Sequence, residues 1–173
     1  MGSEKGTSRP IRFLGDPVLR TVCDPVTTFD ADLKRLVDDM FVSMYDARGV
    51  GLAANQIGVS RRVFVYDCAD GDGRRHVGHV INPVLRVDGE LVTDEEGCLS
   101  VPGLHFPTPR HAQATVVGVD MAGDPVHVTG TGELARCLQH ETGHLDGRLY
   151  IDTLSGDARR AALRAIRAEQ TWT

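Results

Sequence analysis

The sequence predicts a protein of the α+β class, in which an antiparallel sheet packs against a small number of helices. An amphipathic segment near the N-terminus is followed by several short strand-like segments joined by turns, and two further helix-like segments come last. Helices and strands that are separated along the chain in this way favour antiparallel pairing over alternating βαβ units. Composition agrees with a globular fold, with 41% hydrophobic and 25% charged residues.

The 173 residues suffice for one domain, and we expect a single domain over residues 11–173 after a disordered polar tail at 1–10. The net charge of -5 argues against DNA as a partner. No apolar run approaches the roughly 18 residues of a membrane-spanning helix, so we expect no membrane partner. The four cysteines without a visible secretion signal favour a reducing, cytoplasmic setting.

The first expected helix covers residues 30–48. Asp30 is its expected N-cap and Gly49 its end. Apolar side chains recur at the spacing of one helical face. They are Leu33, Leu36, Val37, Met40, Phe41 and Met44.

Strand patterns fill the middle of the chain. Residues 62–66 and 77–87 are expected to be strands, joined by the Gly/Asp-rich turn at 70–73. Residues 114–121 and 125–128 predict a hairpin around the turn at 122–124.

Two helices are expected after the strands. The first covers residues 133–145 and ends before Gly147. The second is capped by Ser155 and runs to about Glu169. The inward face of this last helix is expected to consist of small and apolar residues, namely Ala158, Ala161, Ala162, Ala165 and Ile166.

The helix at 133–145 contains a His-Glu-x-x-His motif at residues 140–144. At about 100° per residue, the side chains of His140 and His144 leave one face of the helix a turn apart, which suits two ligands of one divalent metal. Glu141 can lie beside that metal without binding it, the placement of a general base. The overall expectation is antiparallel or mixed sheets packed around this central metal-binding helix, with an N-terminal and a C-terminal helix.

A catalytic metal needs a third protein ligand. Downstream of His144, Tyr150 stands where one metalloprotease pattern requires His, and the only later Glu is Glu169. The ligand is therefore expected upstream, where Cys98 lies within the segment Glu96-Gly97-Cys98-Leu99-Ser100. A cysteine taken alone is more often a small core residue, so this assignment depends on the rest of the site.

A Gly/Ala-rich loop, Gly-Val-Gly-Leu-Ala-Ala-Asn-Gln, occupies residues 49–56. Its spacing is not that of a phosphate-binding loop and no Lys follows it. Gln56 carries an amide that can donate a hydrogen bond to a developing oxyanion.

The three segments at 49–56, 96–100 and 139–144, taken in this order, resemble the motifs of the peptide deformylase family, and the resemblance covers nearly the whole chain beyond residue 10. Two positions depart from the pattern. Gly143 stands where many members have Asp, and Asn55 stands where many have Pro. We expect the first to change the surroundings of the metal and the second to loosen the loop, with the chemistry intact.

The resemblance implies a metal site of Cys98, His140 and His144 with water in the fourth position. Glu141 would take a proton from that water, which attacks the formyl carbonyl of an N-formyl-methionyl peptide, and formate would leave. Gln56 and the backbone N–H of Leu99 would stabilise the oxyanion.

The resemblance also implies where the substrate lies. The peptide would pair in extended form with Val50 and Gly51 and with the segment near Gly103, and its Met side chain would enter a pocket beside Cys137 and Arg136. Together with Gly97, these are the expected substrate contacts. Glu96 and Arg110 are candidates for an ion pair that steadies the Cys98 segment.

Thiolate and imidazole ligands favour Zn²⁺ or Fe²⁺ by their softness. The resemblance implies Fe²⁺ in the cell, with Zn²⁺, Ni²⁺ or Co²⁺ able to replace it. The expected partners are N-formyl-methionyl nascent peptides, with transient ribosome association. Two alternatives are a zinc endopeptidase, which needs a third ligand after His144, and a non-catalytic metal-binding module, which has no use for Glu141 or Gln56.

Overall fold

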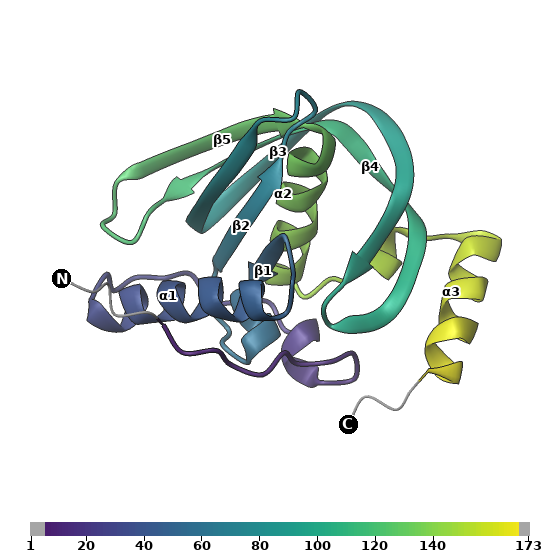
Figure 1. Ribbon diagram of the computed structural model, residues 1–173, viewed down its shortest axis with the longest axis horizontal. Helices are drawn as coiled ribbons and strands as arrows, with labels where there is room; N and C mark the ends of the chain where they lie inside the picture. Colours follow the sequence, from purple (N-terminus) through teal and green to yellow (C-terminus); the bar gives the residue numbers. More distant parts are fainter. Residues whose placement is uncertain (1–5, 170–173) are drawn as a thin grey trace.

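The computed structural model describes residues 6–169 as a five-stranded antiparallel sheet with helices against it (Figure 1). The strands lie in the order β1-β2-β3-β4-β5, so β1 is an edge strand. The strands are β1 (Gly51–Ala53), β2 (Val63–Ala69), β3 (Arg75–Cys98), β4 (Val101–Val119) and β5 (Pro125–Thr131). The α-helices are α1 (Ala31–Asp46), α2 (Gly132–Leu145) and α3 (Gly156–Ala168), and the 3₁₀ turns are η1 (Pro17–Arg20), η2 (Ala54–Ile57) and η3 (Tyr150–Thr153).

The predicted α+β class is confirmed, and β2 shows why the two main helices take opposite faces. Successive side chains of a strand point to opposite sides. Phe64 and Tyr66 pack in one core cluster with Leu134 and Leu138 of α2. Val63 and its neighbours on the other side pack in a second cluster with the apolar stripe of α1. The sheet is therefore buried between the two helices at β2.

The first helix forms as its pattern predicts. The carboxylate of Asp30 caps it by accepting a hydrogen bond from the Leu33 N–H at 3.0 Å. Most of the predicted stripe is buried, while Phe41 is only partly buried. The helix ends at Asp46 because the chain turns sharply at Arg48, which has a φ of 59°.

The hairpin of β3 and β4 is far longer than predicted. The expected strand at 77–87 continues to Cys98, and β4 begins at Val101 rather than at 114. Most side chains from Asp88 to Glu95 are exposed, so this stretch lacks the apolar alternation by which strands are recognised. Register shifts at Asp88/Leu91 and Gly97/Cys98 interrupt the ladder, and Figure 1 shows the curved hairpin bending around α2.

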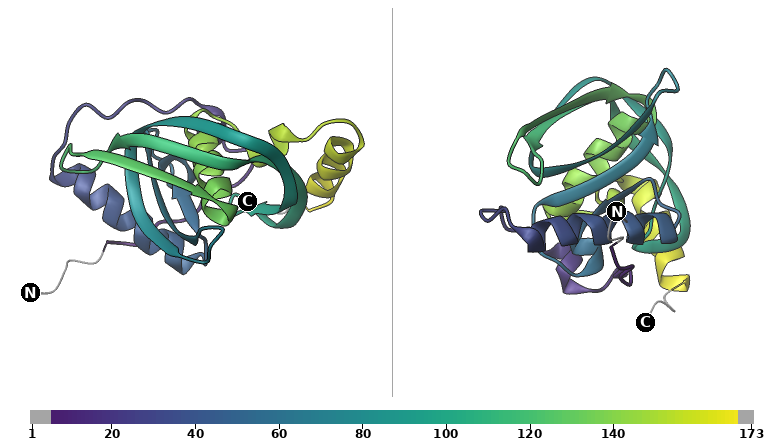
Figure 2. Two further views of the ribbon diagram at one scale, coloured as in Figure 1. Left: turned by 90° about the horizontal axis from the view of Figure 1, so that it is seen from above. Right: turned by 60° about the vertical axis from the view of Figure 1, so that its left-hand side comes forward.

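The last helix is less buried than predicted. Ala162 and Ile166 are buried, but Ala158 and Ala161 are exposed, and the side chain of Ser155 makes no capping hydrogen bond. The cause is that α3 packs through a narrow stripe against η3 and β4 at one end of the molecule, where Figure 2 shows it projecting from the body. None of the helices in the described part of the chain is long and apolar enough to cross a bilayer.

The segment expected to be a tail is partly held in place. Residues 1–5 lie outside the described residues, but the Thr7 N–H donates to Asp39 Oδ1 at 2.7 Å. The Arg9 guanidinium donates two hydrogen bonds to Asp39 Oδ2, at 2.9 and 2.7 Å. Because Asp39 is a buried residue of α1, these bonds fasten residues 7–9 to that helix.

We predict that Asp39→Ala lowers the free energy of unfolding by about 1–3 kcal/mol, since Thr7 and Arg9 lose their shared acceptor. Urea unfolding followed by circular dichroism measures the change. Arg35→Ala is the control, because it removes only an exposed ion pair with Asp32 and should cost less than about 0.5 kcal/mol. Equal losses in the two variants would contradict this role of Asp39.

Candidate metal centre

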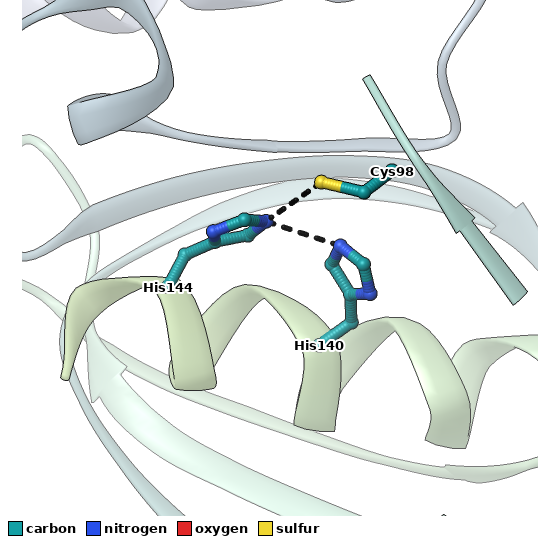
Figure 3. Close-up of side chains that lie close together, drawn as sticks. All are labelled: Cys98, His140 and His144. Carbon is teal, nitrogen blue, oxygen red and sulfur yellow. Dashed lines mark hydrogen bonds between the residues drawn. The ribbon is translucent and has the colours of Figure 1, made fainter. Parts of the chain in front are cut away.

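The three residues predicted as metal ligands meet in space. His140 and His144 project from one face of α2, and Cys98 lies opposite them at the end of β3 (Figure 3). The Nε2 atom of His144 is 3.1 Å from that of His140 and 3.4 Å from the Sγ atom of Cys98. All three ligand atoms lie within 4.8 Å of one another.

This donor set fits a divalent metal. A thiolate and two imidazoles suit Zn²⁺ or Fe²⁺ and leave one tetrahedral position for water or substrate. Ligand nitrogens must be unprotonated, and burial holds the pKa of His144 well below its usual range. The nitrogens and the sulfur converge as a shared cation would require.

A buried ionic network holds His140. Its Nδ1 atom is 2.5 Å from Glu96 Oε1, and Arg110 makes a two-pronged contact with the same carboxylate at 2.6 and 3.1 Å. Burial raises the pKa of Glu96, but hydrogen bonds from His140 and Arg110 outweigh it and bring that pKa to about 2. The ionised Glu96 therefore orients the His140 ring, which directs Nε2 toward the other ligands.

Arg136 serves the same network. It was predicted beside the substrate pocket, and it does line the cavity, but its guanidinium reaches Glu96 Oε2 at 3.1 Å. It also donates to the backbone oxygens of Val92, Asp94 and Thr108 on both strands of the long hairpin. The expected Glu96–Arg110 ion pair is present, whereas this second arginine was not foreseen because the hairpin itself was not.

Gln56 faces the ligands from η2. Its Oε1 accepts a hydrogen bond from the Ala53 N–H at 3.0 Å, which fixes the amide. Its Nε2 then points to Ser100 Oγ at 3.1 Å and to Cys98 Sγ at 3.6 Å. Ser100 is fully buried and was not singled out from the sequence, although it ends the same motif as Cys98.

Glu141 lies beside the ligands with its side chain buried. One carboxylate oxygen, Oε1, has no hydrogen-bond partner among the described residues, and burial raises the pKa of Glu141 to about 7. A Cβ atom at Gly51 would come within 2.5 Å of Glu141 Oε2 and 2.8 Å of Cys137 Sγ. Glycine at position 51 therefore makes room for both side chains.

A cavity of about 950 Å³ opens onto this group. Cys98, His140, Glu141 and Gln56 line it. So do the other residues predicted to contact the substrate or the oxyanion, which are Val50, Gly51, Gly97, Leu99, Gly103, Arg136 and Cys137. Gly51 of the edge strand β1 lines the cavity, and so do Gly97, Leu99 and Gly103 around the turn between β3 and β4.

Comparison with known proteins agrees with this geometry. The polypeptide deformylase family matches residues 8–160. Peptide deformylase 2 of Streptomyces avermitilis is 55% identical over 97% of this chain and 90% of its own length. Peptide deformylase of Parafrankia sp. is 58% identical over 95% of this chain and 88% of its own length.

Solved structures give the same result. A crystal structure of a peptide deformylase from Legionella pneumophila has a TM-score of 0.83 and 44% identity, covering 94% of this chain and 95% of that one. A peptide deformylase from Synechococcus elongatus in complex with actinonin has a TM-score of 0.84 and 30% identity. The match covers 98% of this chain and 97% of that one. With the motifs, the fold and the relatives in agreement, the chain belongs to the polypeptide deformylase family of enzymes.

Proposed function

We propose that this protein is a metal-dependent hydrolase that removes the N-formyl group from the N-terminal formyl-methionine of newly synthesised proteins and releases formate. One observation carries the proposal beyond family membership. The thiol of Cys98 and the imidazoles of His140 and His144 converge beside the buried carboxylate of Glu141, at a cavity that an edge strand borders. We also propose that it acts in the cytoplasm on nascent chains, with transient ribosome association.

Cys98, His140 and His144 would hold one divalent ion, which we propose is Fe²⁺ in the cell and replaceable by Zn²⁺, Ni²⁺ or Co²⁺. When bound, such an ion polarises a carbonyl oxygen and lowers the pKa of water. Glu96 keeps its contact with His140 Nδ1, so this ligand presents Nε2 without rearrangement.

Glu141 is proposed to transfer the proton of the attacking water. Its side chain is buried beside the ligands, lines the cavity, and has a free oxygen among the described residues. In this position it can take a proton from the attacking water and return it to the amine that leaves with the peptide. The same carboxylate thus acts first as base and then as acid.

Gln56 and the backbone N–H of Leu99 are proposed to stabilise the oxyanion. The Gln56 amide is held by the Ala53 N–H, so its Nε2 already faces the ligand cluster at Cys98 before substrate arrives. Preorganised donors of this kind are among the larger contributors to catalysis.

The peptide is proposed to enter as an added strand. Because β1 is an edge strand beside the cavity, an extended peptide can pair along Val50 and Gly51 and reach Gly97 and Gly103 on the hairpin. The Met side chain would lie against Cys137 and the aliphatic stem of Arg136, since the guanidinium is engaged with Glu96. The endopeptidase alternative gains no support, because Cys98 lies with the two histidines and so offers a third ligand from upstream.

The first test combines activity with metal content. Anaerobically purified, metal-loaded protein should release formate from formyl-Met-Ala-Ser, and absence of formate would contradict the proposal. Cys98→Ser should lose bound metal and activity together, because two imidazoles alone bind a divalent ion weakly. Cys23→Ala, which removes a buried thiol outside the ligand cluster, should keep both.

The second test concerns Glu141→Gln. This variant should retain its metal while kcat falls by about 10²–10⁴-fold, the usual contribution of general acid–base catalysis. Metal analysis and formate release measured on the same sample check both parts. Glu90→Gln serves as the control, because it replaces a carboxylate by an amide in the same way at an exposed position of β3. Rates similar to wild type in Glu141→Gln would remove Glu141 from the mechanism.

A further inference from the structure

Asn55 links the loop that carries Gln56 to the helix that carries two metal ligands. It lies on η2 and is fully buried. Its Nδ2 atom donates a hydrogen bond of 2.7 Å to the backbone oxygen of His144, a residue 89 positions away in the sequence. Such a bond between a buried amide and a ligand's own peptide group restrains where the ligand lies.

Neighbouring side chains of η2 thus reach two ligand-bearing elements. Asn55 contacts α2 at His144, while Gln56 contacts the end of β3 at Cys98 and the adjoining Ser100. Because the two amides are consecutive in one short 3₁₀ turn, η2 is hydrogen-bonded both to the strand that carries Cys98 and to the helix that carries His144.

The ring of His144 is held differently from that of His140. The Nδ1 atom of His140 is held by Glu96, whereas the buried Nδ1 atom of His144 has no hydrogen-bond partner among residues 6–169. Metal-binding histidines ordinarily use that second nitrogen to fix the ring. The position of His144 therefore depends more on its backbone than that of His140 does.

The residue directly before His144 is a glycine, which does not favour the helical conformation. Gly143 lies inside α2 between the two histidines, and a Cβ atom added there would meet nothing within 4 Å. Its small size is thus not required by close packing. Glycine within a helix favours the helical conformation less than alanine does, which weakens the turn that carries His144.

We propose that Asn55 is a positioning residue for His144, which holds the last turn of α2 in place where Gly143 weakens it. The inference rests on the metal centre of the proposed function. It relates Asn55 to Gly143, the two positions that depart from the family pattern, because the hydrogen bond from one would compensate for the weaker helix at the other. Asn55 does not touch the reacting atoms, so its effect should appear in metal retention.

The test is a double-mutant cycle on zinc-loaded protein with Asn55→Leu, Gly143→Ala and the combination of both. The rate at which zinc passes to a coloured chelator is measured, together with the visible spectrum of the cobalt-loaded protein and the melting temperature. Asn55→Leu should release zinc about 10-fold faster and shift the cobalt spectrum, the scale seen when partners of metal ligands are removed. Gly143→Ala should recover much of that loss in the combined variant.

Arg62→Met is the matched control. Arg62 donates to the backbone oxygen of Leu145 at 2.9 Å, so it also caps the end of α2. That oxygen keeps a bond from the Cys23 N–H at 2.9 Å. This variant should lower the melting temperature and leave zinc release within about twofold of wild type, since it restrains no ligand directly.

The outcomes separate the hypotheses. Zinc release at the wild-type rate in Asn55→Leu, or equal acceleration in Arg62→Met, would overturn the positioning role. Strictly additive effects in the double variant would overturn the part assigned to Gly143. If Asn55→Leu fails to fold, Asn55→Ala removes the same hydrogen bond with a smaller side chain and carries the same expectation. A wild-type protein that binds no zinc would instead refute the metal centre, and with it the proposed function.

Discussion

The contact between the Glu96 carboxylate and the His140 imidazole is the interaction on which the site depends. It joins the end of β3 to α2, and so brings Cys98 to the two histidines although they are more than 40 positions apart in the sequence. A buried carboxylate is costly unless it is paired and hydrogen-bonded. Arg110 and Arg136 meet that need, and Arg136 in addition fastens the backbone of both hairpin strands. The ionised carboxylate of Glu96 thus holds His140, and with it α2, to the β3–β4 hairpin.

The same arrangement explains how a small fold can offer a rigid site beside an open cavity. The sheet is buried between α1 and α2 at β2, which leaves one face of α2 turned toward the hairpin tip and the edge strand β1. Glycine at position 51 lets Glu141 and Cys137 approach the backbone of β1 closely. The candidate metal ligands and Glu141 therefore lie on regular elements, while segments of the edge strand and of the hairpin line the cavity.

Local patterns predicted the parts of the structure that short-range physics determines. The α1 stripe with its Asp30 cap, the position of α2 and the two histidines on one of its faces followed from periodicity and motif spacing. That Cys98 joins the two histidines was expected from the family resemblance, and the three residues do meet in space. The hairpin from 88 to 113 did not, because exposed residues such as Leu91 give no alternation and the pairing is long-range. The roles of Arg136, Ser100 and Asn55 followed only once that hairpin and η2 had been placed against α2.

X-ray absorption spectroscopy of the zinc-loaded protein tests the central claim most directly, because it counts the ligand types around the ion. The geometry predicts one sulfur at about 2.3 Å and two imidazole nitrogens at about 2.0–2.1 Å, with a light oxygen or nitrogen scatterer in the remaining position. Cys98→Ser should remove the sulfur shell. A zinc environment without sulfur in the unaltered protein, or with more than one sulfur, would contradict a centre built from Cys98, His140 and His144.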